Sequence, residues 1–221
     1  MNQTNQNDFQ RSLDFIWGAS LAAFCCFLLW PPGREAFTGA TKTAPFFMGF
    51  AKVAILASMG ELLAIRLSHG IWKLPYGMLL RAFIWGMFGI SFTLVFPVFD
   101  KGTNAVVAGG LLPSFGINGF YLQILVAFYT SSLMNMIFAP TFMAIHRITD
   151  SMIELRTISS VAAFAAIDWN HFYGFVLLKT IPFFWIPAHT VTFLLPPEYR
   201  VLMASLLSIA LGAILSSGKR I

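Results

Sequence analysis

Four ionisable side chains lie within or at the edge of apolar stretches of this chain, where their charge needs either a partner or water. They are Lys52, Glu61, Arg81 and Lys179. A charged group in hydrocarbon is costly unless it is paired or hydrated, so such residues mark ion pairs, solute contacts or proton paths. These four residues are therefore the candidate pore-lining or solute-contacting groups.

Glu61 is the central candidate because it lies in the middle of its apolar segment. It shares a helix face with small residues, so we expect it to face protein or a water-filled cavity. Three roles fit: a buried ion pair with Arg81 or Lys179, contact with a solute in a pore, or a step in a proton relay. Lys52 and Arg66 belong to the opposite face of the same segment, from which long side chains can reach the membrane interface.

The chain contains none of the residue patterns that mark common catalytic or metal sites. It has no Gly-x-Ser-x-Gly elbow, no His-Glu-x-x-His, no phosphate loop and no Cys-x-x-Cys. His146 and Asp150 are four residues apart, which is more typical of a solvated contact than of a ligand site. Cys25 and Cys26 are adjacent and too few to hold a metal. The sequence predicts no enzyme, no cofactor and no metal site.

The composition excludes most soluble classes. Of the 221 residues, 57% are hydrophobic and 10% are charged, against about 25% charged in an ordinary soluble domain. The net charge of +5 comes from scattered residues, so no continuous basic patch is available for nucleic acid. A disordered chain and a coiled coil are excluded as well. The expected partners are the lipid bilayer and either a second copy of the chain or a larger membrane complex.

Six apolar runs are long enough to cross a bilayer, which takes about 20 residues of helix. We therefore predict an all-α, polytopic transmembrane helical bundle that forms a single membrane domain over residues 1–221, with residues 12–44 as an extra N-terminal helix and loop before a bundle over 45–221. Prolines should kink or split several helices, namely Pro97, Pro140, Pro182 and Pro187. The runs are Leu13–Trp30, Pro45–Leu67, Pro75–Phe99, Phe120–Ile145, Phe172–Leu195 and Tyr199–Ser217.

Small residues at four-residue spacing predict which helix faces pack inside the bundle, because membrane helices associate by close approach of their backbones. The first run has Gly18 and Ala22, and the second has Ala54 and Ser58. The sixth has an unbroken row, made of Ala204, Ser208, Gly212 and Ser216. We expect these three faces to point into the bundle.

The distribution of Lys and Arg predicts the orientation, because these residues favour the cytoplasmic side. With six crossings, seven of them fall on the side of the termini and four on the other side. The first set is Arg11, Arg66, Lys73, Arg147, Arg156, Lys219 and Arg220, and the second is Arg34, Lys42, Lys101 and Arg200. Both termini are therefore expected on the cytoplasmic or equivalent side.

Several short motifs are similar to those of one membrane-protein family. They are Met59-Gly60-Glu61, Gly86 and Gly89 followed by Phe96-Pro97, Phe138-Ala139-Pro140, Trp185-Ile186-Pro187, and Leu195-Pro196-Pro197-Glu198-Tyr199-Arg200. Over residues 49–217 the chain resembles the Mpv-seventeen/peroxisomal-membrane-protein-twenty-two family of small integral membrane proteins. It departs from that family in the apolar segment before residue 45 and in the glycine-rich stretch around residues 104–118.

The resemblance implies a channel for a small solute or an ion. Two other functions remain open. One is a non-conducting structural or accessory subunit of a membrane assembly. The other is a secondary transporter, which has less support because the two halves of the sequence show no inverted repeat. Because the N-terminus has no basic or Arg-rich leader pattern, a prokaryotic cytoplasmic membrane is favoured. The mitochondrial inner membrane and the peroxisomal membrane are the alternatives.

Overall fold

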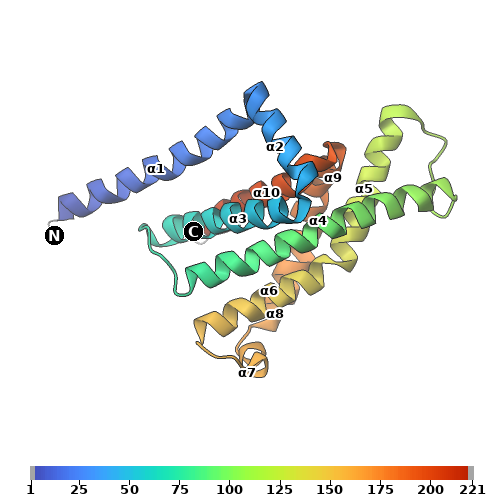
Figure 1. Cartoon of the computed structure of the whole chain (residues 1–221). Coiled ribbons are helices and arrows are strands. Elements are labelled where there is room, and N and C mark those ends of the chain that lie inside the picture. Colours follow the sequence, from blue (N-terminus) through green and yellow to red (C-terminus); the bar gives the residue numbers. More distant parts are fainter. Residues whose placement is uncertain (1–2, 219–221) are drawn as a thin grey trace. The chain divides into compact units, whose positions relative to one another are not determined.

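The computed structural model describes residues 3–218, and their side chains from residue 7 to residue 214. This part of the chain consists of helices joined by loops and has no strand (Figure 1). The elements are α1 (Gln3–Leu29), α2 (Pro31–Thr43), α3 (Pro45–His69), α4 (Met78–Ala108), α5 (Gly119–Ile137), α6 (Ala139–Glu154), α7 (Ser160–Ala165), α8 (Trp169–His171), η1 (Phe172–Trp185), α9 (Ile186–Leu194) and α10 (Pro197–Gly218). The predicted all-α class is confirmed.

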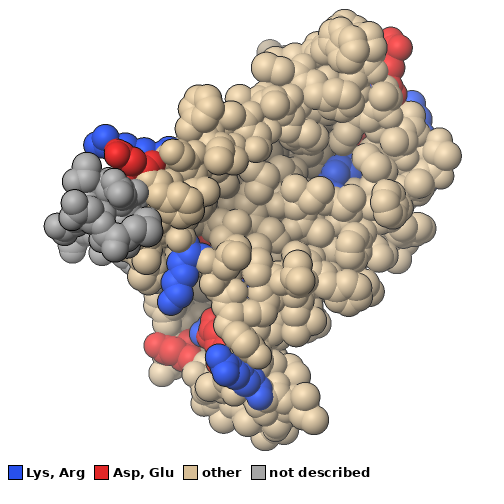
Figure 2. Space-filling view, turned by 60° about the vertical axis from the view of Figure 1, so that its left-hand side comes forward, with Lys and Arg blue, Asp and Glu red and all other residues tan. Residues whose placement is uncertain are grey.

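Six stretches of helix within the described residues are long and apolar enough to cross a membrane. They are Asn7–Leu29, Pro45–His69, Met78–Ala108, Gly119–Ile137, Trp169–Leu194 and Pro197–Ile214. Many large apolar side chains on them point outward; Leu79, for example, is 88% exposed and Phe183 is 81% exposed. The face seen in Figure 2 carries charged side chains in only a few places. This surface suits lipid, and the protein is an integral membrane protein of six candidate spans.

Residues 31–43 form helix α2, where we expected a loop. The local reason is the pair Pro31 and Pro32, which occupy the first helical positions after an extended Trp30. Proline is favoured there because its fixed φ suits a helix and its missing N–H would have no partner in the first turn. Gly33 follows where α2 packs on α1, and a Cβ at this position would clash with the backbone carbonyl oxygen and the ring of Phe27.

Two prolines in long apolar runs have different outcomes. At Pro140 the run splits as expected, because α5 ends at Ile137 and α6 begins at Ala139. Pro97 lies inside α4, which continues to Ala108. The helix therefore extends well past Phe99, where the third apolar run ends in the sequence.

The fifth span runs without a break from Trp169 to Leu194, although we expected Pro182 and Pro187 to break it. Its central part, η1, has the wider π-helical hydrogen-bond pattern and contains Pro182. Proline removes one backbone donor and crowds the preceding turn of an α-helix, and a π-turn is one way for a helix to absorb such a disturbance. Pro187 is tolerated because it lies in the first turn of α9.

The described chain divides into two compact units, and the end of α4 and the start of α10 belong to a different unit from the rest of those helices. Unit 1 comprises the chain up to Ile90 together with the chain from Ser205 onward, and unit 2 comprises Ser91–Ala204. The predicted division into an addition over residues 12–44 and a bundle over 45–221 stays a prediction.

In unit 1, polar contacts from the middle of α1 hold it to α3 and to the loop that follows α3. Arg66, expected to reach for the interface, forms a salt bridge with Asp14 at 2.8 Å. The indole Nε1 of Trp72 donates to the same carboxylate at 2.8 Å. The indole Nε1 of Trp17 donates to the carbonyl of Met59 at 3.2 Å.

The small-residue faces have mixed outcomes. On α3, Ser58 is buried and Ala54 is half-buried. Gly60 and Gly212 meet where α3 packs on α10, and a Cβ added at Gly212 would lie 3.4 Å from the carbonyl oxygen of Gly60. Ser208 is half-buried, and Ala204 joins the core of unit 2. The side chain of Ser216 lies outside the described residues, as do Lys219 and Arg220.

The face of α1 does not pack as expected within the described chain. Gly18 and Ala22 are both exposed, and no atom outside its own helix backbone and its chain neighbours lies within 4 Å of where a Cβ of Gly18 would be. Small residues at four-residue spacing indicate only that two helices could approach closely. Such a face is buried only if a partner helix is also within reach.

Gly212→Leu should destabilise the protein, because the new side chain would meet the backbone of Gly60 and the Cβ of Ala64. Overpacking of this kind costs about 1–3 kcal/mol. The matched control is Gly18→Leu, which faces open space and should leave stability nearly unchanged. Thermal unfolding of both variants in detergent gives the comparison, and equal melting temperatures for the two would contradict the packing of α3 on α10.

Candidate functional site

The charged residues singled out in the sequence lie in different surroundings. Glu61 is half-buried, and its Oε1 accepts a hydrogen bond at 2.6 Å from the indole Nε1 of Trp85 on α4. Arg81 is buried, and its Nε donates to the carbonyl of Tyr76 at 3.3 Å. Both contacts lie within unit 1. An indole donor for Glu61 was not expected, and its ion pair with Arg81 or Lys179 stays a prediction.

The other two lysines also differ from each other. Lys179 is exposed, and its Nζ lies 5.9 Å from the ring centroid of Phe175. Lys52 is buried, and its Nζ lies 3.2 Å from the hydroxyl of Thr41.

A set of buried polar side chains lies where α5 packs on α9 in unit 2. Ser131 is 0% exposed, Asn135 is 1% exposed and His189 is 8% exposed. Ser131 and Asn135 are four residues apart on α5 and therefore share one face of that helix. Trp185, the last residue of η1, lies beside His189 of α9. We call these four residues the polar seam.

Hydrogen bonds join the two sides of the polar seam. The hydroxyl of Ser131 donates to the carbonyl of Ile186 at 2.7 Å. The amide nitrogen of Asn135 donates to the carbonyl of Ser131 at 2.8 Å and lies 3.0 Å from Nδ1 of His189. In a membrane such bonds help to hold two helices together in one register.

Two ring nitrogens of the polar seam have no hydrogen-bond partner among the described residues. They are Nε2 of His189 and Nε1 of Trp185. The two rings are stacked with their centroids 5.2 Å apart, so the two nitrogens belong to neighbouring groups. Buried polar atoms without a partner are rare and point to a ligand or another functional contact. The polar seam can therefore exchange hydrogen bonds with a small polar molecule.

A cavity of about 690 Å³ lies within unit 2 and has a mixed polar and apolar wall. We call it the vestibule. Its polar wall is formed by Asp100, Asn104, Gln123 and Arg200. Arg200 and Asp100 form a salt bridge at 2.7 Å, with side chains that are 12% and 26% exposed. The wall thus offers hydrogen-bond donors and acceptors while its two opposite charges are paired with each other.

Arg200 also fixes the end of α9. Its Nε donates to the carbonyl of Leu195 at 3.0 Å, and its NH2 nitrogen donates to the carbonyl of Phe193 at 3.1 Å. The guanidinium carbon lies 5.4 Å from the ring centroid of Phe193. Carbonyls at a helix end lack partners within the helix, and Arg200 supplies them from the first turns of α10.

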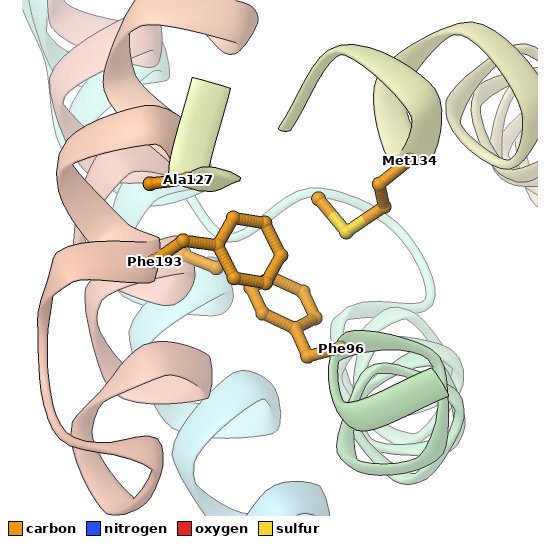
Figure 3. Close-up of a cluster of buried hydrophobic side chains, with 5 residues drawn as sticks. Phe96, Ala127, Met134 and Phe193 are labelled. Carbon is orange, nitrogen blue, oxygen red and sulfur yellow. The ribbon is translucent and has the colours of Figure 1, made fainter. Parts of the chain in front are cut away.

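An apolar cluster lies between the vestibule and the polar seam. It consists of Phe96, Ala127, Met134, Phe193 and Ala204. Figure 3 shows the rings of Phe96 and Phe193 overlapping, with Met134 directed toward them, and their centroids are 5.3 Å apart. Phe193 and Ala127 also line the vestibule. On the other side, the ring of Phe96 lies 5.7 Å from that of His189. Vestibule, cluster and seam are therefore contiguous.

Some residues of the family-like motifs belong to the vestibule and the polar seam. Trp185 is in the polar seam and Arg200 is in the vestibule wall. The others surround them: Pro97 lies in α4, Phe138 between α5 and α6, Pro140 and Pro187 in the first turns of α6 and α9, Pro196 between α9 and α10, and Tyr199 in the first turn of α10. Sequence reasoning missed Ser131, Asn135, His189 and Asp100 as site residues. The available signal was the four-residue spacing of polar side chains within apolar runs.

Breaking the vestibule salt bridge should destabilise the protein, because Arg200→Met leaves the carboxylate of Asp100 partly buried without its cation. The expected loss is about 1–3 kcal/mol, between the values for exposed and buried pairs. A double-mutant cycle with Asp100→Asn isolates the pair from the carbonyl contacts of Arg200. Denaturation in detergent measures the cycle, with Lys101→Met as the exposed control. Additive effects of the two changes would contradict an energetic coupling.

Comparison of the chain with protein-family models, with curated proteins and with solved structures gives no match. The resemblance described from the motifs therefore stays a proposal. The geometry within unit 2 is the basis on which a function can be argued.

Proposed function

We propose that this integral membrane protein is a channel that conducts small, uncharged polar solutes by way of unit 2. One observation carries the proposal: a cavity with a polar wall is contiguous, through an apolar cluster, with a buried polar seam that holds unpartnered ring nitrogens. The resemblance of residues 49–217 to a family regarded as pore-forming points in the same direction.

Each part would have a distinct task. The vestibule would admit the solute and replace part of its water shell with Asn104, Gln123 and the paired Asp100 and Arg200. The stacked rings of Phe96 and Phe193 would form an apolar constriction, of the kind that gates by excluding water. Beyond it, His189 and Trp185 would offer hydrogen bonds to a molecule that has just lost those of the vestibule.

The charge pattern favours an uncharged solute over an ion. The two charged groups that line the vestibule neutralise each other at 2.7 Å, and the apolar cluster contributes no polar side chain. An ion crossing such a constriction would lose hydration with no fixed charge to compensate it. A polar molecule without net charge has less to lose.

The direct test is flux in liposomes that contain only this protein. We expect glycerol to enter such vesicles faster than protein-free ones, measured by light scattering after rapid mixing, with no accompanying K⁺ conductance in planar bilayers. If neither permeates, the protein is a non-conducting subunit, as the alternative reading holds. K⁺ conductance would contradict the assignment to uncharged solutes.

Two substitutions should move the glycerol rate in opposite directions. Phe193→Leu shortens the side chain at the constriction and should raise the rate. Asn135→Leu removes the amide that holds His189 and should lower the rate by about fivefold, since one hydrogen bond contributes about 1 kcal/mol and 1.4 kcal/mol is a factor of ten. Thermal unfolding of each variant checks that it is folded before its flux is compared.

Glu61→Gln is the matched control for the path. The amide oxygen can still accept the hydrogen bond of Trp85, so fold and glycerol rate should both be kept. A changed solute preference at unchanged stability would contradict the path through unit 2 and favour one that Glu61 lines.

A further inference from the structure

Lys52 is a buried cation in unit 1 with no acidic partner among the described residues. Its side chain is 7% exposed. The ammonium nitrogen lies 3.2 Å from the hydroxyl oxygen of Thr41 and 4.9 Å from the ring centroid of Phe37, both on α2. A hydroxyl and a ring face compensate the loss of water only in part, because a buried charge is normally paired with an opposite charge. This surrounding is complementary to an anion.

The same side chain lines a cavity of about 460 Å³ between α1, α2 and α3. This volume falls in the range of about 300–1,000 Å³ that is common for ligand sites. The wall is almost entirely carbon, with Phe24 and Phe27 from α1, Phe37 from α2, and Met48, Ile55 and Leu56 from α3 among its residues. The cavity therefore joins one cationic group to a long apolar surface.

We propose that this cavity binds a long-chain fatty acid, with its carboxylate on Lys52 and its hydrocarbon chain along the apolar wall. A carboxylate accepts hydrogen bonds from an ammonium group and supplies the missing negative charge, while the hydroxyl oxygen of Thr41 holds the same ammonium in place at 3.2 Å. The remaining wall requires a ligand with nothing but carbon and hydrogen beyond its acidic end. Phe37 lies beside both parts, since its ring contacts the ammonium and also lines the cavity.

A fatty acid fits this site better than a membrane phospholipid does. Glycerol esters and a headgroup would bring several further polar atoms against side chains that cannot bond them. Ser20, also in the wall, already donates its hydroxyl to the carbonyl of Ile16 at 2.8 Å. Lys52 also lies seven residues into α3 from Pro45, about 10 Å along the helix axis, which is deep for a phosphate that stays at the interface.

The inference does not depend on the proposed conduction, because all residues that line the cavity belong to unit 1. The ligand is therefore an amphiphile bound from the lipid or detergent phase and is independent of the solute in the vestibule of unit 2.

The test is equilibrium binding of tritiated palmitate to the full-length protein in a neutral detergent. We expect saturable binding to the wild type and a loss of affinity of about tenfold or more for Lys52→Met, which keeps the apolar stem and removes the charge. Thr41→Val should weaken binding less. Lys42→Met is the matched control, since this exposed lysine lies next to Thr41 in sequence, and it should bind palmitate as the wild type does.

Two further measurements decide the chemistry of the ligand and guard against misfolding. Palmitate should raise the melting temperature of the wild type and of Lys42→Met but not of Lys52→Met, because a ligand stabilises only a fold that binds it. Hexadecanol, which lacks the carboxylate, should compete poorly. Equal palmitate affinity of Lys52→Met and the wild type would overturn the proposal, as would equal competition by hexadecanol or displacement of palmitate by equimolar phosphatidylglycerol.

Discussion

The absence of water from the bilayer core is the constraint on which this architecture depends. Inside hydrocarbon every backbone N–H and C=O must be satisfied by the protein, and a helix does so within one segment. This explains why the chain stays helical even where its sequence disfavours it. Pro182 is accommodated by a wider π-helical stretch, and Pro97 lies inside a helix that runs on for eleven more residues. Within residues 3–218, Phe138, two residues before Pro140, is the one place where an apolar run separates into two helices.

The same constraint acts on the charged side chains, which find three kinds of neighbour. Glu61 accepts a hydrogen bond from an indole, and Arg200 pairs with Asp100 while it caps a helix end. Lys52 has a hydroxyl and an aromatic face. These surroundings differ in how much of the charge they compensate. The ion pair leaves little uncompensated, whereas the surrounding of Lys52 leaves most of a positive charge. A ligand is therefore expected at Lys52 and not at the ion pair of Arg200 and Asp100.

Much of the fold follows from the sequence, because length and composition suffice to define apolar segments. All six spans are predicted from the sequence, as is the split at Pro140, but the third span runs on to Ala108 beyond its predicted end at Phe99, and the fourth ends at Ile137, before its predicted end at Ile145. Helix α2 was missed because its thirteen residues are polar and rich in Gly and Thr, which favours a loop when only composition is considered. The burial of a face was harder still, since Gly18 and Gly212 have the same kind of spacing and only Gly212 meets a partner.

The site was less accessible from sequence because it depends on which helices meet. Ser131 and Asn135 define a polar face on one helix, and Trp185 and His189 define one on another, but nothing in the sequence brings α5 against α9. Charge drew attention to Glu61 instead, since a carboxylate is conspicuous in an apolar run and a neutral histidine–asparagine contact is not.

The π-helical stretch η1 also determines in which direction the side chains of the following helix, α9, face. Each residue of an α-helix turns the chain by about 100°, and a π-turn accommodates more residues than an α-turn does. The facing of α9 is therefore fixed by how many residues the preceding stretch, Phe172–Trp185, winds into each turn. Rewinding one of these turns as α-helix would rotate His189 away from Asn135 without changing a single residue of either helix. The alignment of the polar seam therefore depends on the backbone hydrogen-bond pattern of Phe172–Trp185, and not on which side chains the two helices carry.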